Sequence, residues 1–165
     1  RELAKEYDVD VANLNAPGQI VISGSRDNIL SAVNKVKDFG CKMGKVLEVA
    51  GAYHSRLMAG AQDKLAQELE KFNIVIPNFP VISNVEAKSI VDIDSIRASL
   101  ERQVTGSVRW HESMEFLLDS SPEATFIEFS PKPVLAGLMN RIRREVEVLT
   151  VSDPESLEEV TIALS

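Results

Sequence analysis

The stretch Gln-Ile-Val-Ile-Ser-Gly-Ser-Arg-Asp-Asn-Ile-Leu-Ser-Ala-Val-Asn-Lys-Val, residues 19–36, changes the spacing of its apolar residues halfway along. Its first part, Gln19 to Ser23, is a β-branched run that Gly24 closes, which is typical of a short strand. From Asp27 to Phe39 the apolar residues recur every three or four positions, the period of a helix. The stretch therefore predicts a strand, a turn and a helix.

The same alternation continues along the rest of the chain. Lys45 to Val49 predicts a second strand, and Arg56 to Phe72 an amphipathic helix with charged residues opposite its apolar face. Further segments follow in order: a strand at 81–84, helices at 93–104 and 114–118, a strand at 125–129, a helix from Ser130-Pro131 to Arg144, and a strand at 146–150. Strands that alternate with helices of this length predict α/β architecture with a largely parallel sheet.

Composition excludes several classes of protein. The chain has 165 residues, of which 44% are hydrophobic, enough for a folded core. No stretch approaches the roughly 20 apolar residues of a membrane span, and the net charge of -7 argues against a nucleic-acid surface. The single cysteine, Cys41, cannot form an internal disulfide and is expected to be buried. We expect no membrane or nucleic-acid partner, a reducing, cytoplasmic location, and a solvated acidic tail after Arg144.

His54 is the residue best placed for chemistry. It follows the predicted strand at 45–49, at a bend that Gly51 permits, and it precedes the long predicted helix. Sites in α/β folds form at strand ends, and a histidine can take up and return a proton near neutral pH. From the residues alone, a histidine that caps or packs at a helix start is the alternative. His111, beside Trp110, is expected to be structural.

Amide side chains supply further candidates. Residues 13–19 predict a loop before a strand, in which Asn15 and Gln19 could donate to a polar ligand; an ordinary turn is the alternative. Gln103 could hold another group by hydrogen bonding or lie on the surface.

The sequence contains no nucleophile to match His54. It has no Gly-x-Ser-x-Gly turn, no phosphate-binding glycine loop and no Cys or His pair at metal-ligand spacing. The nearest hydroxyl, Ser55, is the sequence neighbour of His54, and adjacent residues rarely align hydroxyl and imidazole. The chain is expected to hold part of a hydrolase or acyltransferase site.

Five blocks of sequence, taken in order, resemble one family, the malonyl-coenzyme A:acyl-carrier-protein transacylases of fatty-acid and polyketide synthesis. They are residues 15–24, 51–58, 80–85, Arg102-Gln103 with 108–110, and 128–131 with 134–138. The resemblance implies a partial α/β-hydrolase-like large lobe with a ferredoxin-like small lobe, residues 1–50 forming the small lobe and 51–165 part of the large one.

The resemblance also implies roles for individual residues. His54 would be the base that activates a serine, and the Gln103 position would supply the acceptor that fixes the imidazole tautomer. Asn15 and Gln19 would lie near the pantetheine arm. Tyr53 stands where phenylalanine is usual, in a motif associated with malonyl selection.

The implied reaction moves malonyl from coenzyme A to the thiol of an acyl carrier protein through a serine-bound intermediate. Malonyl-CoA and the carrier protein are the expected partners, with no cofactor beyond the coenzyme A thioester as substrate. The serine is expected upstream of Arg1, so that this chain alone would be inactive. Alternatives are an acyltransferase domain of a polyketide synthase, a non-catalytic domain that binds an acyl carrier protein, and a self-contained hydrolase that uses Ser55.

Overall fold

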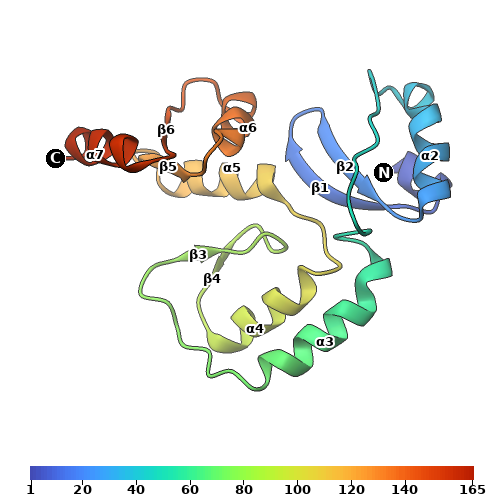
Figure 1. Ribbon diagram of the computed structural model, residues 1–165, viewed down its shortest axis with the longest axis horizontal. Coiled ribbons are helices and arrows are strands. Elements are labelled where there is room, and N and C mark those ends of the chain that lie inside the picture. Colours follow the sequence, from blue (N-terminus) through green and yellow to red (C-terminus); the bar gives the residue numbers. More distant parts are fainter. The chain divides into compact units, whose positions relative to one another are not determined.

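The computed structural model describes residues 1–165 and divides into two compact units, Arg1–Ser113 and Met114–Ser165. Helices and strands occur in both units, which makes the fold mixed α/β, as predicted (Figure 1). Each unit is described below by itself.

The first unit begins with a hairpin flanked by helices. Its elements are α1 (Glu2–Glu6), β1 (Asp10–Ala16), β2 (Gln19–Ser23), α2 (Arg26–Lys35) and the 3-10 helix η1 (Val36–Phe39). The Ser25 hydroxyl caps α2 by accepting from the Asn28 N–H at 3.3 Å, and Gly40 ends η1 in the left-handed conformation. The strand, turn and helix predicted over residues 19–39 are confirmed, although the last turn is 3-10 rather than α.

The β1–β2 hairpin is antiparallel and turns at Pro17-Gly18. Gly18 has a φ of 73°, which glycine adopts without strain. The buried face of β1 carries Ala12 and Ala16, two small residues of the core. The predicted loop at 13–19 is therefore wrong in part: residues 13–16 belong to a strand, and Asn15 and Gln19 lie on either side of a tight turn.

β1 has a second neighbour on its other edge. The Leu14 N–H donates to the carbonyl of Val108, and the Val108 N–H donates to the carbonyl of Ala12, both at 2.8 Å. This short parallel bridge joins the hairpin to a loop nearly a hundred residues further along the chain.

The remainder of the first unit consists of helices and a short hairpin. Its elements are η2 (Arg56–Met58), α3 (Ala59–Leu69), β3 (Val81–Ile82), β4 (Ser89–Ile90), α4 (Ile93–Arg102) and the start of α5 (Trp110–Ser120). Helices α3 and α4 lie side by side (Figure 1). Asp92 caps α4 through the Ser95 N–H at 2.7 Å; hydrogen bonds from Ser95 lower the pKa of the Asp92 carboxyl.

The second unit is built around two parallel strands. β5 (Phe126–Phe129) pairs with β6 (Val148–Val151), and α6 (Val134–Ile142) lies between them in sequence. The predicted start of this helix at Ser130-Pro131 is wrong, because the Ser130 hydroxyl instead closes a turn with Lys132. α6 begins where the buried Glu128 carboxylate accepts from the N–H groups of Leu135 and Ala136.

The acidic residues after Arg144 are solvent-exposed, as predicted, but the end of the chain is a helix. α7 (Pro154–Ala163) starts with a capping box between Asp153 and Ser156. Hydrogen bonds from Ser156 lower the pKa of the Asp153 carboxyl.

Three further expectations are wrong. The strands form three two-stranded sheets, of which only β5–β6 is parallel. Lys45–Val49 forms neither strand nor helix, because it has no partner for its main-chain groups. Cys41 is exposed.

No helix has both the length and the apolar character needed to cross a membrane.

Candidate catalytic site around His54

His54 lies on a tight turn just before η2. Its φ of 56° falls in the left-handed region, which costs a residue with a side chain about 1 kcal/mol or more. The next residue, Ser55, is fully buried; its hydroxyl donates to the carbonyl of Ala52 at 2.6 Å and accepts from the Leu57 N–H at 3.3 Å. These two hydrogen bonds close the turn and help to offset the backbone strain.

The imidazole of His54 faces two carbonyl oxygens. Nδ1 lies 2.8 Å from the main-chain oxygen of Gln103 and 3.1 Å from that of Gly106. A carbonyl can only accept, so a neutral ring must carry its proton on Nδ1 to satisfy either contact. Nε2 then holds a lone pair, which is the form that a general base requires.

The loop that supplies these carbonyls follows α4 directly. The Gln103 N–H donates to Ser99 at 3.0 Å, and the Gly106 N–H donates to Arg102 at 2.8 Å, so that both peptide groups are held from the helix end. The acceptor at Gln103 is its main-chain oxygen, not its side-chain amide.

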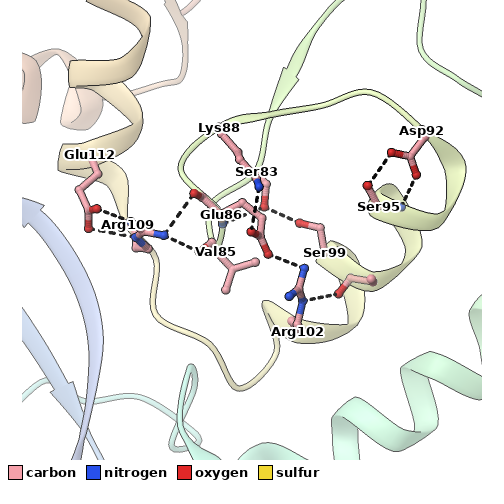
Figure 2. Close-up of polar contacts among 11 residues, drawn as sticks. Ser83, Val85, Glu86, Lys88, Asp92, Ser95, Ser99, Arg102, Arg109 and Glu112 are labelled. Atoms are coloured by element: carbon pink, nitrogen blue, oxygen red, sulfur yellow. Dashed lines mark hydrogen bonds and ion pairs between the residues drawn. The ribbon is translucent and has the colours of Figure 1, made fainter.

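Arg109 braces the far end of this loop (Figure 2). Its guanidinium donates to the carbonyls of Val85 at 3.4 Å and Glu86 at 3.2 Å, and its Nε donates to the Glu112 carboxylate at 3.0 Å. The hydrogen bond from Arg109 lowers the pKa of Glu112, and the same bond raises the pKa of Arg109. The β3–β4 hairpin is thereby tied to the loop that holds His54.

A second ion pair, between Arg102 and Glu86, joins α4 to the same hairpin, and the hydroxyls of Ser83 and Ser99 meet between them (Figure 2). Sequence reasoning missed Glu86 and Glu112. The i,i+3 spacing of Arg109 and Glu112 in a helix start could have revealed the second partner, whereas no local pattern links Glu86 to Arg102.

The other predicted site residues take different places. Tyr53 precedes His54 on the turn and is 50% exposed. Asn15 and Gln19 lie at the turn end of the β1–β2 hairpin, and the contacts that hold the His54 ring come from elsewhere. The buried Ser55 hydroxyl is engaged in the turn, which argues against its use as a nucleophile.

Three residues near the site were not predicted: Asp8, Asp10 and Arg56. The Arg56 N–H donates to Asp10 Oδ2 at 2.9 Å, and its guanidinium donates to the Asp8 carbonyl at 2.9 Å and pairs with the Asp8 carboxylate. An open groove of about 440 Å³ adjoins them; its lining is Asp10, Val11, Arg56, Ala59, Gln62, Thr105, Gly106 and Ser107. Nowhere in the chain do three or more His, Cys, Asp or Glu side chains form a cluster that could hold a metal ion.

Comparison with known proteins identifies the family of the chain. The acyl transferase domain family matches residues 1–158. Among curated relatives, the malonyl CoA-acyl carrier protein transacylase of Bacillus subtilis is 41% identical over 150 residues, which are 91% of this chain and 47% of that protein. The transacylase of Staphylococcus aureus is 34% identical over 152 residues, covering 92% and 48%. The chain belongs to the acyl transferase domain family, and both of these relatives are malonyl CoA-acyl carrier protein transacylases.

Solved structures agree. A malonyl CoA-acyl carrier protein transacylase from Clostridium perfringens superposes with a TM-score of 0.91 at 34% identity, over 99% of this chain and 52% of that one. A malonyl-transacylase in complex with the acyl-carrier protein of a type II polyketide synthase also gives 0.91, at 35% identity over 98% and 52%. The chain spans about half the length of the relatives that it matches.

Proposed function

We propose that this chain carries the general base of a malonyl transfer from coenzyme A to the thiol of an acyl carrier protein. The observation that supports this role is the contact of His54 Nδ1 with the carbonyls of Gln103 and Gly106, which in the neutral ring places the lone pair on Nε2. The malonyl donor, the carrier protein and the reaction are those that the names of the relatives describe.

In the first half of the reaction, His54 Nε2 removes the proton of a serine hydroxyl as the oxygen attacks the thioester carbonyl. The bond to sulfur breaks, and the imidazolium returns the proton to the departing coenzyme A thiolate. In the second half, Nε2 takes the proton of the carrier-protein thiol, whose sulfur attacks the malonyl-serine ester. The serine oxygen leaves with that proton, which restores the starting state.

The serine in this scheme belongs to a part of the protein outside these residues. The one hydroxyl beside His54, that of Ser55, is buried and already donates to Ala52. By this proposal the chain alone is inactive and needs no cofactor beyond its coenzyme A thioester substrate. Residues 1–50 belong to a ferredoxin-like small lobe and 51–165 to part of an α/β-hydrolase-like large lobe, in a cytoplasmic enzyme.

The substrate-binding assignments are part of the same proposal. Tyr53, half exposed beside the base, crowds an α-methyl branch and favours malonyl, an effect of about 1 to 3 kcal/mol for one methyl group. Asn15 and Gln19 line the approach of the pantetheine arm.

The test is malonyl transfer from coenzyme A to a carrier protein, measured with the complete gene product. His54→Ala should lower kcat/KM by at least about 1,000-fold, because a base and the acid step that follows are both lost. His111→Gln, at the only other histidine, is the matched control and should keep most of the activity. Equal activity of wild type and His54→Ala would make His54 structural.

Two alternatives stand beside this proposal, one supported by a relative and one decided by the same test. A relative 39% identical over 149 residues is a polyketide-biosynthesis malonyl CoA-acyl carrier protein transacylase of Bacillus subtilis, which supports an alternative in which the malonyl group enters a polyketide rather than a fatty acid. A non-catalytic domain that binds an acyl carrier protein would be favoured if the wild type and His54→Ala were both inert while carrier binding persisted.

A further inference from the structure

The turn that carries His54 is hydrogen-bonded to Asp10, the first residue of β1. The main-chain N–H of Arg56 donates to Asp10 Oδ2 at 2.9 Å, and Arg56 Nε lies 3.8 Å from the same oxygen. The guanidinium continues to Asp8, where it meets both the carbonyl and the carboxylate. Two residues after the imidazole, the chain is thus held at a fixed point of the hairpin.

The same strand holds the loop that supplies the carbonyl acceptors of His54. The Ser107 hydroxyl donates to the carbonyl of Val11, and the Val108 N–H donates to the carbonyl of Ala12 at 2.8 Å. These contacts begin one residue after Gly106, whose oxygen accepts from Nδ1. β1 therefore contacts both the segment that bears the ring and the segment that bears its acceptors.

These contacts differ in how strongly they are expected to stabilise the turn. The side chains of Arg56 and Asp8 are 55% and 74% exposed, and ion pairs so open to water add little. The Asp10 side chain is 28% exposed and accepts a main-chain N–H, a contact that is more shielded from water. The hydrogen bond between Asp10 and the Arg56 N–H is therefore the one expected to matter.

We propose that Asp10 is a positioning residue for His54. By holding the N–H of Arg56 it keeps the left-handed turn in place, so that Nδ1 stays on the carbonyls of Gln103 and Gly106 and the lone pair stays on Nε2. The consequence for catalysis rests on the proposed function; the consequence for the tautomer does not.

Two pairs of variants isolate this contact in the complete gene product. Asp10→Ala removes the acceptor, whereas Asp10→Asn keeps an oxygen that can accept the N–H. Arg56→Pro removes the donor, whereas Arg56→Ala removes only the guanidinium. Proline suits the first position of η2, and Ser55 before it has the extended backbone, φ -132° and ψ 163°, that a following proline requires. Glu68→Ala, which breaks an exposed ion pair with Lys71 on α3, controls for loss of surface charge.

In the malonyl transfer assay, Asp10→Ala and Arg56→Pro should lower kcat about five- to tenfold with KM changed by less than about twofold, because the base and not the substrate is misplaced. Asp10→Asn, Arg56→Ala and Glu68→Ala should stay within about twofold of wild type. Arg56→Pro with the same kcat as Arg56→Ala would overturn the proposal.

The tautomer of His54 gives a second readout. Nitrogen-15 NMR of the ring should show Nδ1–H in the wild type and in Asp10→Asn, with a shift toward Nε2–H in Asp10→Ala and Arg56→Pro. An unchanged tautomer in folded Arg56→Pro would contradict a positioning role. If Asp10→Ala does not fold, the comparison of Arg56→Pro with Arg56→Ala decides. If the wild type transfers no malonyl, the proposed function fails while the tautomer still tests the role of Asp10.

Discussion

Gly106 offers its carbonyl to His54 from a place that admits no side chain. A Cβ built there would lie 2.6 Å from Val85 Cγ2 and 2.7 Å from the main-chain oxygen of Arg102. That oxygen accepts the Gly106 N–H at 2.8 Å, so it cannot retreat without loss of the hydrogen bond. The exclusion of larger residues thus follows from packing rather than from an unusual φ.

We therefore predict that Gly106→Ala destabilises the protein by about 2 kcal/mol through overpacking and also slows malonyl transfer by displacing an acceptor of His54. Urea unfolding and the transfer assay measure the two effects. Gly60→Ala is the control: Gly60 lies in α3 with no atom within 4 Å of its added Cβ, so alanine should stabilise the helix by up to about 1 kcal/mol. A fully stable and active Gly106→Ala would show that the loop relaxes freely.

At the same scale, sequence could propose His54 as a candidate base but could not predict the atoms that orient its ring. The ring of His54 contacts Gln103, but through the main-chain oxygen, which every residue possesses. Gly106 and Asp10 were not predicted at all, because a carbonyl and a distant carboxylate leave no local pattern.

Among the elements, α6 depends on a buried carboxylate at its start. Glu128 is 5% exposed, and its two oxygens accept the N–H groups of Leu135 at 2.9 Å and Ala136 at 2.7 Å. These N–H groups have no partner within the helix, and the positive end of the helix dipole favours the charge.

We predict that Glu128→Gln lowers the free energy of unfolding by about 2 kcal/mol, because one acceptor becomes an NH2 group that faces a donor. Urea unfolding measures the change. Glu159→Gln on the exposed face of α7 makes the same chemical change and should shift stability by less than about 0.5 kcal/mol. Equal effects of the two substitutions would mean that Glu128 does not hold the helix start.

Local signals account for which elements sequence could predict. α2 and α3 follow from the spacing of their apolar residues. α7 was missed because its acidic composition suggested a solvated tail, although Asp153-Pro154 and Ser156 form a readable start signal. β1 was missed because Asn13 and Asn15 are poor strand formers whose pairing with β2 and Val108 overrides propensity.

For the whole molecule, the class of fold could be predicted from the sequence, whereas the pairing of the strands could not. Alternating strands and helices predicted a largely parallel sheet, and only β5 and β6 form a parallel pair. A β-branched or apolar run shows that a segment can be a strand; whether it becomes one depends on a neighbour that offers hydrogen bonds along the same edge.

Lys45–Val49 tests this reasoning. The segment has strand-like composition but takes part in no strand, and Leu47 and Val49 are exposed, whereas the Leu14 and Val108 amides are bonded at 2.8 Å across the β1 edge. Hydrogen exchange of this chain, followed by NMR or mass spectrometry, should therefore be at least about 100-fold faster at 45–49 than at Leu14 and Val108. Slow exchange at 45–49 would contradict this prediction. It would mean that the segment pairs with a neighbouring strand in solution, as its sequence predicts.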